Sequence, residues 1–144
     1  MIVEKMQEID LPRVAQLEAL CFRYHWSLEQ CIDEYKHNPY SIGFLVKEAE
    51  EIFGYAFLWE QYDICQLSRI GIDPKYRHKK AATFLLETMM KHAKQKGCLT
   101  MSLDCRVGNR PALALYESCG FQCVHVAKKY YSDGEDAAVM VRKL

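Results

Sequence analysis

One feature constrains this chain most: a strand that must end at a proline, followed by a basic turn and a long amphipathic segment. Ile70-Gly71-Ile72 has the apolar character of a strand, and Asp73-Pro74 ends it because proline cannot donate to a sheet ladder. Apolar residues then recur at helical spacing from Ala82 to Ala93. This order predicts an anion-binding corner, because the first amides of a helix lack internal partners and the helix dipole favours negative charge there.

The turn carries the consecutive basic residues Arg77, His78, Lys79 and Lys80. Their charge adds to the field of the helix N-terminus and favours a phosphate ligand. Basic residues at a helix start are also common as a solvated corner, where they oppose the dipole. The turn by itself is therefore consistent with either interpretation.

Length and charge limit the classes of function. The 144 residues fit one domain, spanning 1–144, with a sizeable core. The 19 Lys and Arg residues balance the 19 Asp and Glu residues, so the formal net charge is zero. A general nucleic-acid binder has a basic excess, so we expect no direct nucleic-acid partner and favour a small anionic ligand at the local basic turn.

The cysteine pattern predicts a reducing compartment. Seven cysteines are scattered without a CxxC pair, which indicates free thiols in a cytoplasmic protein. Cys119, Cys123 and His125 lie close together, but no second ligand pair completes a zinc site, so we expect no metal. Residues 1–10 have no apolar signal core, and no apolar run has the length of a membrane span. We therefore expect no membrane partner.

The remaining segments read as short strands and helices separated by turn residues. The strand–helix–strand unit around the basic turn implies a parallel crossover, and the hairpins elsewhere imply antiparallel pairing. The expected class is α/β (α+β) with a mixed sheet. The predicted elements are a strand at Ile2–Val3, a helix capped by Asp10, an aromatic loop at Phe22–Trp26, a helix from Ser27 to Asn38 with a Ser27/Gln30 capping box, strands Ser41–Lys47, Ile52–Trp59 and Cys65–Ile72, the long helix ending at Gly97, a strand Leu99–Cys105, a helix from Asn109 to Gly120, and strands Phe121–Val126 and Ala137–Val141.

Three polar residues of the C-terminal half are placed by pattern alone. Alternation from Leu99 to Cys105 puts Asp104 on the polar face, near the C-terminal end of its strand. Asn109 is expected to cap the following helix. Tyr116 falls on the apolar side of that helix, where packing alone accounts for it.

In element order and motifs the chain resembles the GNAT superfamily of acyl-CoA N-acyltransferases. Its C-terminal third is similar to the ribosomal-protein-alanine N-acetyltransferase (RimI-like) branch. The resemblance implies a GNAT-like, mostly antiparallel sheet of seven strands flanked by about four helices. The motifs that carry it are Ile70-Gly71-Ile72-Asp73-Pro74, Tyr76-Arg77, Leu103-Asp104-Cys105-Arg106, Asn109, Ala114-Leu115-Tyr116-Glu117, Gly120-Phe121, Tyr130-Tyr131 and Gly134-Glu135-Asp136-Ala137.

Two positions depart from the pattern of that family. Lys80 stands where the turn motif Arg/Gln-x-x-Gly-x-Gly/Ala usually has its central glycine, and Asp104 stands where the RimI-like branch generally has Glu. We expect helical φ/ψ at Lys80, which needs no glycine, and a phosphate cradle made mostly of backbone amides. The shorter carboxylate of Asp104 predicts a contact with the amine through water.

The resemblance implies an enzyme that transfers acetyl from acetyl-CoA directly to an amine in a ternary complex. Asp104 is the expected base, although pairing with Arg106 or capping of the loop would also account for it, and Glu60 and Asp63 are alternative bases. Tyr116 is the expected acid for the departing thiolate. The expected cofactor-binding residues are Ile70, Gly71, Ile72, Arg77, His78, Lys79, Lys80, Ala81, Ala82, Asn109 and Tyr116.

The acceptor implied by the resemblance is the α-amine of a protein N-terminus, most naturally the alanine of a ribosomal protein. Tyr130 and Tyr131 are expected to bind the substrate, unless they merely alternate between core and surface. Trp26 is a further candidate for substrate binding, although packing is the favoured role of its aromatic loop. The alternative functions are an acetyltransferase for a small amine or another peptide, and a non-catalytic acyl-CoA-sensing module. The oligomeric state is not predicted.

Overall fold

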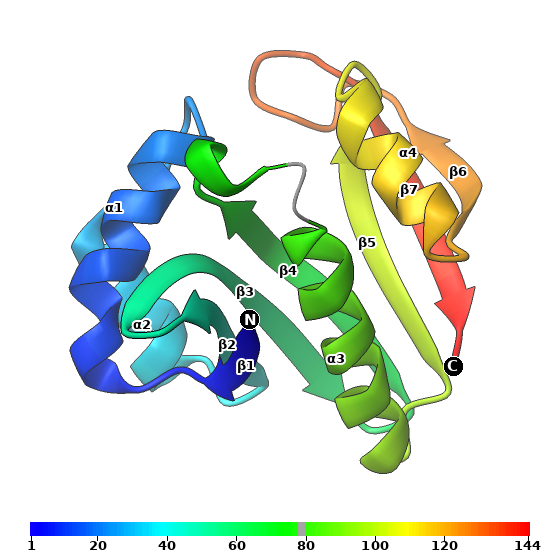
Figure 1. Cartoon of the computed structure of the whole chain (residues 1–144). Coiled ribbons are helices and arrows are strands. Elements are labelled where there is room, and N and C mark those ends of the chain that lie inside the picture. The colour runs from blue at the N-terminus through cyan, green and yellow to red at the C-terminus, as the bar shows by residue number, and fades with distance from the viewer. Residues whose placement is uncertain (78–79) are drawn as a thin grey trace.

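A mixed sheet forms the centre of the computed structural model, which describes residues 1–77 and 80–144 (Figure 1). The seven strands within these residues have the spatial order β1-β2-β3-β4-β5-β7-β6. They are β1 (Ile2–Lys5), β2 (Ser41–Glu48), β3 (Glu51–Gln61), β4 (Ile64–Ile72), β5 (Thr100–Arg106), β6 (Gln122–Ala127) and β7 (Ala137–Lys143). Every neighbouring pair is antiparallel except β4–β5, so the predicted mixed sheet and parallel crossover are confirmed.

Helices cover both faces of this sheet. The described residues form α1 (Leu11–Cys21), α2 (Leu28–His37), α3 (Ala81–Gln95) and α4 (Arg110–Ser118), with short 3-10 turns η1 (Glu8–Asp10) and η2 (Pro74–Tyr76). One buried cluster joins α1 and α2 to the sheet, and a larger one joins α3 and α4 to the opposite face. The two layers of helices therefore lie on opposite faces of the sheet (Figure 1).

The parallel pair β4–β5 opens part-way along its length. Its register ends with Leu67 opposite Leu103, although both strands continue beyond that pair. On the other side of β4, the register with β3 shifts between Phe57 and Leu58, which leaves Ser68 as an extra residue at the point of separation. The edge of β4 beyond Leu67 thus presents backbone groups to the opening instead of to β5 (Figure 1).

The predicted helix caps were right in two places and wrong in one. Ser27 and Gln30 form the expected capping box at α2, with donor–acceptor distances of 2.8 and 3.1 Å. Asn109 caps α4, since its Oδ1 accepts from Ala112 N at 3.3 Å. Asp10 does not cap α1: its Oδ2 accepts from Gln7 N at 2.8 Å, because Asp10 closes the preceding 3-10 turn.

The predicted inward face of β5 was right except at its first residue. Met101, Leu103 and Cys105 are buried, whereas Leu99 is 64% exposed. Leu99 precedes the strand, and its amide donates to Asp63 O at 2.6 Å in the neighbouring turn.

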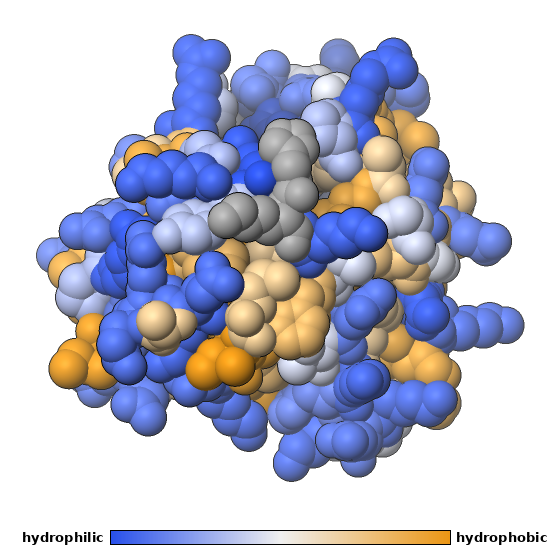
Figure 2. Space-filling model, viewed as in Figure 1, coloured by the Kyte–Doolittle hydropathy of each residue, from blue (hydrophilic) through white to orange (hydrophobic). Residues whose placement is uncertain are grey.

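The surface is mostly polar on the face shown in Figure 2, with small apolar areas near the centre of the view. Within the described ranges, no helix combines the length and the apolar character needed to cross a bilayer.

Candidate active site

Lys80 begins α3 in a left-handed conformation. Its φ is 59° and its ψ is 23°, and its carbonyl accepts from Phe84 N at 3.0 Å. The prediction of helical φ/ψ at Lys80 was therefore wrong, because this left-handed region is the one that favours glycine. A non-glycine residue there costs about 1 kcal/mol. The Lys80 side chain is exposed and makes no cap hydrogen bond.

Three other predicted cofactor-binding residues near this helix end, Arg77, Ala81 and Ala82, lie within the described residues. Arg77 is exposed and lies beside the Cys21 thiol at the end of α1. Ala81 is buried and Ala82 half-buried against the core, so small side chains bring the start of α3 close to the sheet. His78 and Lys79, which were also predicted to contact the cofactor, lie outside the described residues.

The β4 edge of the opening is formed by Ile70, Gly71 and Ile72. Each of the three pairs with β3 on its far side. Gly71 lies against Tyr55, where an added Cβ would come within 2.6 Å of the ring carbon Cε1. A side chain at Gly71 would therefore push β4 away from β3 and change the opening.

Asp104 lies on β5 directly after the last residue paired with β4, and it is half-buried. Its Oδ2 accepts a hydrogen bond of 2.8 Å from the hydroxyl of Tyr130, which belongs to the β6–β7 loop. This bond to a carboxylate raises the pKa of the Tyr130 phenol above its ordinary value. The alternative in which Asp104 pairs with Arg106 is not observed, because Arg106 binds Asp133 and Glu135 instead.

Tyr116 projects from α4 and is 7% exposed. Its ring makes an edge contact with Phe121 at a centroid distance of 6.0 Å, and it lies near Cys105 and Tyr131. Burial raises the pKa of the Tyr116 phenol well above its ordinary value, so the hydroxyl keeps its proton at neutral pH. No residue in the described ranges accepts a hydrogen bond from that hydroxyl.

Asp104 and Tyr116 lie on opposite faces of β5. Successive side chains of a strand alternate, and Cys105 points into the core on the α3 and α4 side, where Tyr116 also packs. Asp104 and Arg106 therefore point to the α1 and α2 side, where Arg106 approaches Tyr24 of the α1–α2 loop. The β4–β5 opening therefore has the Asp104 carboxylate on one face of the sheet and the Tyr116 phenol on the other.

The α1–α2 loop is held against β4 by Arg69, a residue that the sequence analysis did not single out. Its guanidinium carbon lies 4.3 Å from the ring centre of Phe22 and 4.6 Å from that of Trp26. Trp26 also contacts Phe57 at a centroid distance of 5.8 Å. Packing is thus an observed role of Trp26, on the same side of the sheet as Asp104.

Glu18 forms an ion pair with Arg69, and the sequence analysis did not single it out either. It is fully buried on α1 and accepts from Arg69 Nη2 at 2.8 Å, from Trp26 N at 2.8 Å and from the Tyr55 hydroxyl. Burial, and then the Glu18 carboxylate, raise the pKa of the Tyr55 phenol far above its ordinary value. The signal in the sequence was a glutamate on the apolar stripe of a helix, which requires a buried partner.

Glu60 and Asp63, the alternative bases, lie at the closed end of the β4–β5 pair. Glu60 Oε1 is 2.6 Å from His92 Nε2 of α3, and the Asp63 carbonyl accepts from Leu99 N at 2.6 Å. Glu60 pairs with Cys65 at the start of β4, far along the strand from the opening. Both residues therefore lie apart from Asp104, and the choice among the three carboxylates as the base stays a prediction.

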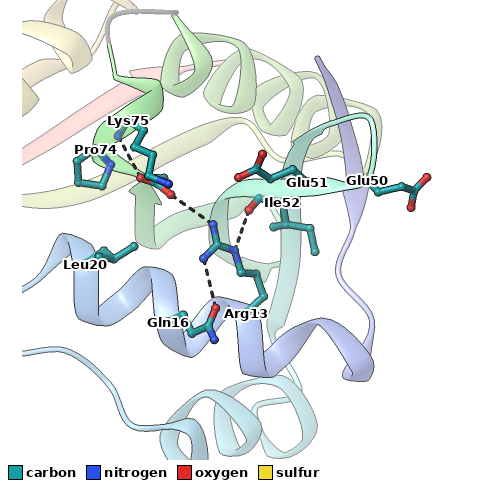
Figure 3. A pocket seen from close by; sticks show the side chains of 9 residues that line it. Arg13, Gln16, Leu20, Glu50, Glu51, Ile52, Pro74 and Lys75 are labelled. Carbon is teal, nitrogen blue, oxygen red and sulfur yellow. Dashed lines mark hydrogen bonds and ion pairs between the residues drawn. The ribbon is translucent and has the colours of Figure 1, made fainter.

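A cavity of about 760 Å³ lies away from these residues, between α1, the β2–β3 turn and η2 (Figure 3). Arg13 crosses it and donates to Ile52 O at 2.9 Å and to Gln16 Oε1 at 3.3 Å, and it pairs with Asp73 Oδ2 at 3.3 Å. None of the predicted site residues that the structure describes lines it. The polar groups of Arg13 are thus engaged within the fold.

Comparison with known proteins gives the family. The model of the Acetyltransferase (GNAT) family matches residues 11–121. The chain belongs to this family. It is an N-acetyltransferase of the GNAT type, and the resemblance predicted from its motifs is confirmed.

Two of three similar proteins cover nearly the whole GNAT chain, and the third covers about half of it. A protein of Bacillus subtilis (strain 168), provisionally assigned as a [ribosomal protein bS18]-alanine N-acetyltransferase, is 32% identical over 139 residues, which are 96% of this chain and 92% of that protein. An N-alpha-acetyltransferase of Saccharolobus solfataricus is 47% identical over 76 residues, 52% of this chain and 46% of that protein. The crystal structure of the ribosomal-protein-S18-alanine N-acetyltransferase from Escherichia coli superposes with a TM-score of 0.90 at 26% identity, covering 99% of this chain and 92% of that one.

Proposed function

We propose that this chain uses acetyl-CoA to acetylate the α-amine of a protein N-terminus, in particular the N-terminal alanine of a ribosomal protein. The observation that carries the proposal is the opening between β4 and β5 beyond Leu67, with Asp104 and Tyr130 on one face and Tyr116 on the other. The names of the Bacillus subtilis and Escherichia coli relatives state ribosomal-protein alanine as the acceptor, which supports this acceptor class.

The residues around the opening fit acetyl-CoA. The N-terminus of α3 offers backbone amides to the diphosphate, and the left-handed Lys80 begins that helix with its charged side chain exposed. The free edge of β4 at Ile70–Ile72 offers backbone groups to the pantetheine. When bound, the cofactor supplies an activated acetyl thioester. A backbone amide of β4 is the donor that we assign to the developing oxyanion.

The acid and the base follow from the two faces of β5. An α-amine has a pKa of about 8, so a weak base such as a carboxylate suffices to accept its proton. Asp104 takes this role, directly or through water, and the Tyr130 hydroxyl that now binds it marks a site for a hydrogen-bond donor. Tyr116 keeps its proton because of burial, which suits donation to the departing thiolate.

The walls beside Asp104 provide the acceptor site. Tyr130 is 52% exposed and Tyr131 half-buried, and their rings meet edge to face at 5.1 Å. Trp26 belongs to the opposite wall. Asn109 is assigned to the pantetheine arm in addition to its cap. The two tyrosine rings lie beside Asp104, where a peptide that follows the α-amine would contact them. A small amine has no such chain to contact the rings, which favours a peptide acceptor.

Residues 1–144 act as one GNAT domain in this proposal, and the enzyme works in the cytoplasm. Seven free cysteines support a reducing compartment.

The test is mass spectrometry of an alanine-headed peptide incubated with the protein and acetyl-CoA. We expect one added acetyl group at the α-amine, and no product from a peptide whose α-amine is already blocked. Spermidine and an aminoglycoside are the small-amine controls. Turnover of these amines without turnover of the peptide would contradict the proposal, as would acetyl-CoA binding without transfer to any amine.

A further inference from the structure

Arg106 contacts both loops that flank the opening. It follows Asp104 by two residues on the same face of β5, and 30% of its side chain is exposed. Its guanidinium carbon lies 4.0 Å from the ring centre of Tyr131 in the β6–β7 loop. The same carbon lies 6.0 Å from the ring centre of Tyr24 in the α1–α2 loop. The Arg106 guanidinium therefore lies against both the β6–β7 loop and the α1–α2 loop, the two loops that flank the opening.

Ion pairs fix the β6–β7 loop to this cation. Arg106 Nη1 lies 2.8 Å from Asp133 Oδ2 and 3.0 Å from Glu135 Oε1. Glu135 Oε2 also accepts from Gly108 N at 2.9 Å, just beyond the end of β5. The backbone N–H of Glu135 and then the guanidinium lower the pKa of the Asp133 carboxyl, so its carboxylate stays charged at neutral pH.

The position of Tyr130 depends on this arrangement. Consecutive loop tyrosines meet β5 residues that are two apart: Tyr130 binds Asp104, and Tyr131 lies on Arg106. Asp104 and Arg106 share one face of the strand. The contact of Tyr131 with the Arg106 guanidinium therefore fixes the position from which the Tyr130 hydroxyl donates to the Asp104 carboxylate. The geometry around the base is thus determined by a residue that does not itself contact the reacting atoms.

We infer that Arg106 is a positioning residue that sets the affinity for the acceptor, an inference that rests on the proposed peptide acetylation. It holds the β6–β7 loop and the α1–α2 loop at the distance that a peptide N-terminus requires. The N-terminus of α3 and the β4 edge lie outside its contacts, so the affinity for the cofactor does not depend on it.

The test compares Arg106→Met with Arg106→Lys and a matched control. Arg106→Met keeps an apolar stem and removes the charge. We expect the KM for the alanine-headed peptide to rise about tenfold, because the β6–β7 and α1–α2 loops are no longer held at a fixed distance from each other. The KM for acetyl-CoA should stay within about twofold, since its site lacks these contacts. Arg106→Lys restores one charge without the planar fork and should recover part of the loss.

The control is Lys128→Met, which removes the ion pair between Lys128 and Asp136 in the same loop. That pair spans 3.2 Å, and the Lys128 side chain is 79% exposed, so we expect no change in either KM. Asp133→Asn provides a second approach if Arg106→Met does not fold. It should raise the peptide KM in the same direction, and combining it with Arg106→Lys should give less than the sum of the two effects.

Titration calorimetry of the CoA-loaded protein with the peptide gives a readout without turnover, where we expect Arg106→Met to weaken binding about tenfold. An unchanged peptide affinity in both Arg106→Met and Asp133→Asn would overturn the inference, as would an equal loss of affinity for acetyl-CoA. A wild-type protein that binds the peptide without acetylating it would contradict the proposed function alone. A wild-type protein that does neither would overturn both.

Discussion

At the scale of single residues, the site depends on a few side chains whose surroundings decide their protonation and geometry. Tyr116 stays protonated because it is buried, and Asp104 is engaged by the Tyr130 hydroxyl at 2.8 Å. Lys80 adopts a left-handed conformation at the start of the helix assigned to the diphosphate. Each of these features gives a prediction that a single substitution or a pH series can test.

Tyr116→Phe removes the acid and leaves the aromatic ring in its packing site. We expect kcat to fall about a hundredfold with the KM for acetyl-CoA within about twofold, because the phenol acts as the thiolate departs. Steady-state kinetics on the alanine-headed peptide measure both. Tyr35→Phe, a half-buried phenol on α2, is the matched control and should retain full turnover. Equal losses in kcat and cofactor affinity would show that Tyr116 only packs.

The pH dependence of kcat/KM for the peptide should have an ascending limb and then a plateau. The neutral amine is the nucleophile, so the rate rises as pH increases through about 8. Burial raises the pKa of Tyr116 above its ordinary 10.0, so the acid remains protonated and no descending limb begins below pH 10. A fall in rate that begins below about pH 10 would assign the acid to another group.

Lys80→Gly should stabilise the fold. Glycine adopts a φ of 59° without the steric cost that lysine meets, so we expect the free energy of unfolding to rise by about 1 kcal/mol. Urea unfolding followed by circular dichroism measures it. Because the Lys80 charge lies at a helix end assigned to an anion, the affinity of the wild type for acetyl-CoA should weaken with salt, and that of the variant should weaken less. Destabilisation by the glycine would contradict the assigned conformation.

At the scale of elements, an ion pair between α1 and β4 holds the α1–α2 loop against the sheet. Glu18 of α1 is fully buried, and Arg69 of β4 is its cation at 2.8 Å. Arg69 also lies over the rings of Phe22 and Trp26 and donates to Tyr24 O at 3.2 Å. The contacts of Arg69 thus join the α1–α2 loop to β4, at the residue that follows the extra residue Ser68.

Arg69→Met leaves the Glu18 carboxylate in the core without a cation. We expect the free energy of unfolding to fall by about 3–5 kcal/mol, the usual penalty for half of a buried pair. Denaturant unfolding of the single variants and of Arg69→Met combined with Glu18→Gln measures it. The double variant should be more stable than Arg69→Met alone, because the unpaired charge is gone. Additive losses would show that the two residues act independently.

At the scale of the whole molecule, local patterns predicted the order of elements, while the contacts between elements required the three-dimensional structure. The alternation from Met101 to Cys105 and the Ser27/Gln30 box are short-range signals and were right. Arg69 carries no local signal of its role, because its partner Glu18 is 51 residues away.

The candidate site divides in the same way. Asp104 and Tyr130 were both selected from motifs, but their hydrogen bond across 26 residues follows from how the β6–β7 loop folds onto β5. The conformation of Lys80 was mispredicted, because a lysine gives no sequence signal for a left-handed φ.

The central claim is that the opening between β4 and β5, together with the start of α3, holds the cofactor. A crystal structure of the protein with CoA tests it most directly. We expect the diphosphate at the amides that follow Lys80 and the pantetheine along Ile70–Ile72 of β4. CoA bound instead in the cavity around Arg13, or a Lys80 main chain that closes off the helix end, would contradict the account.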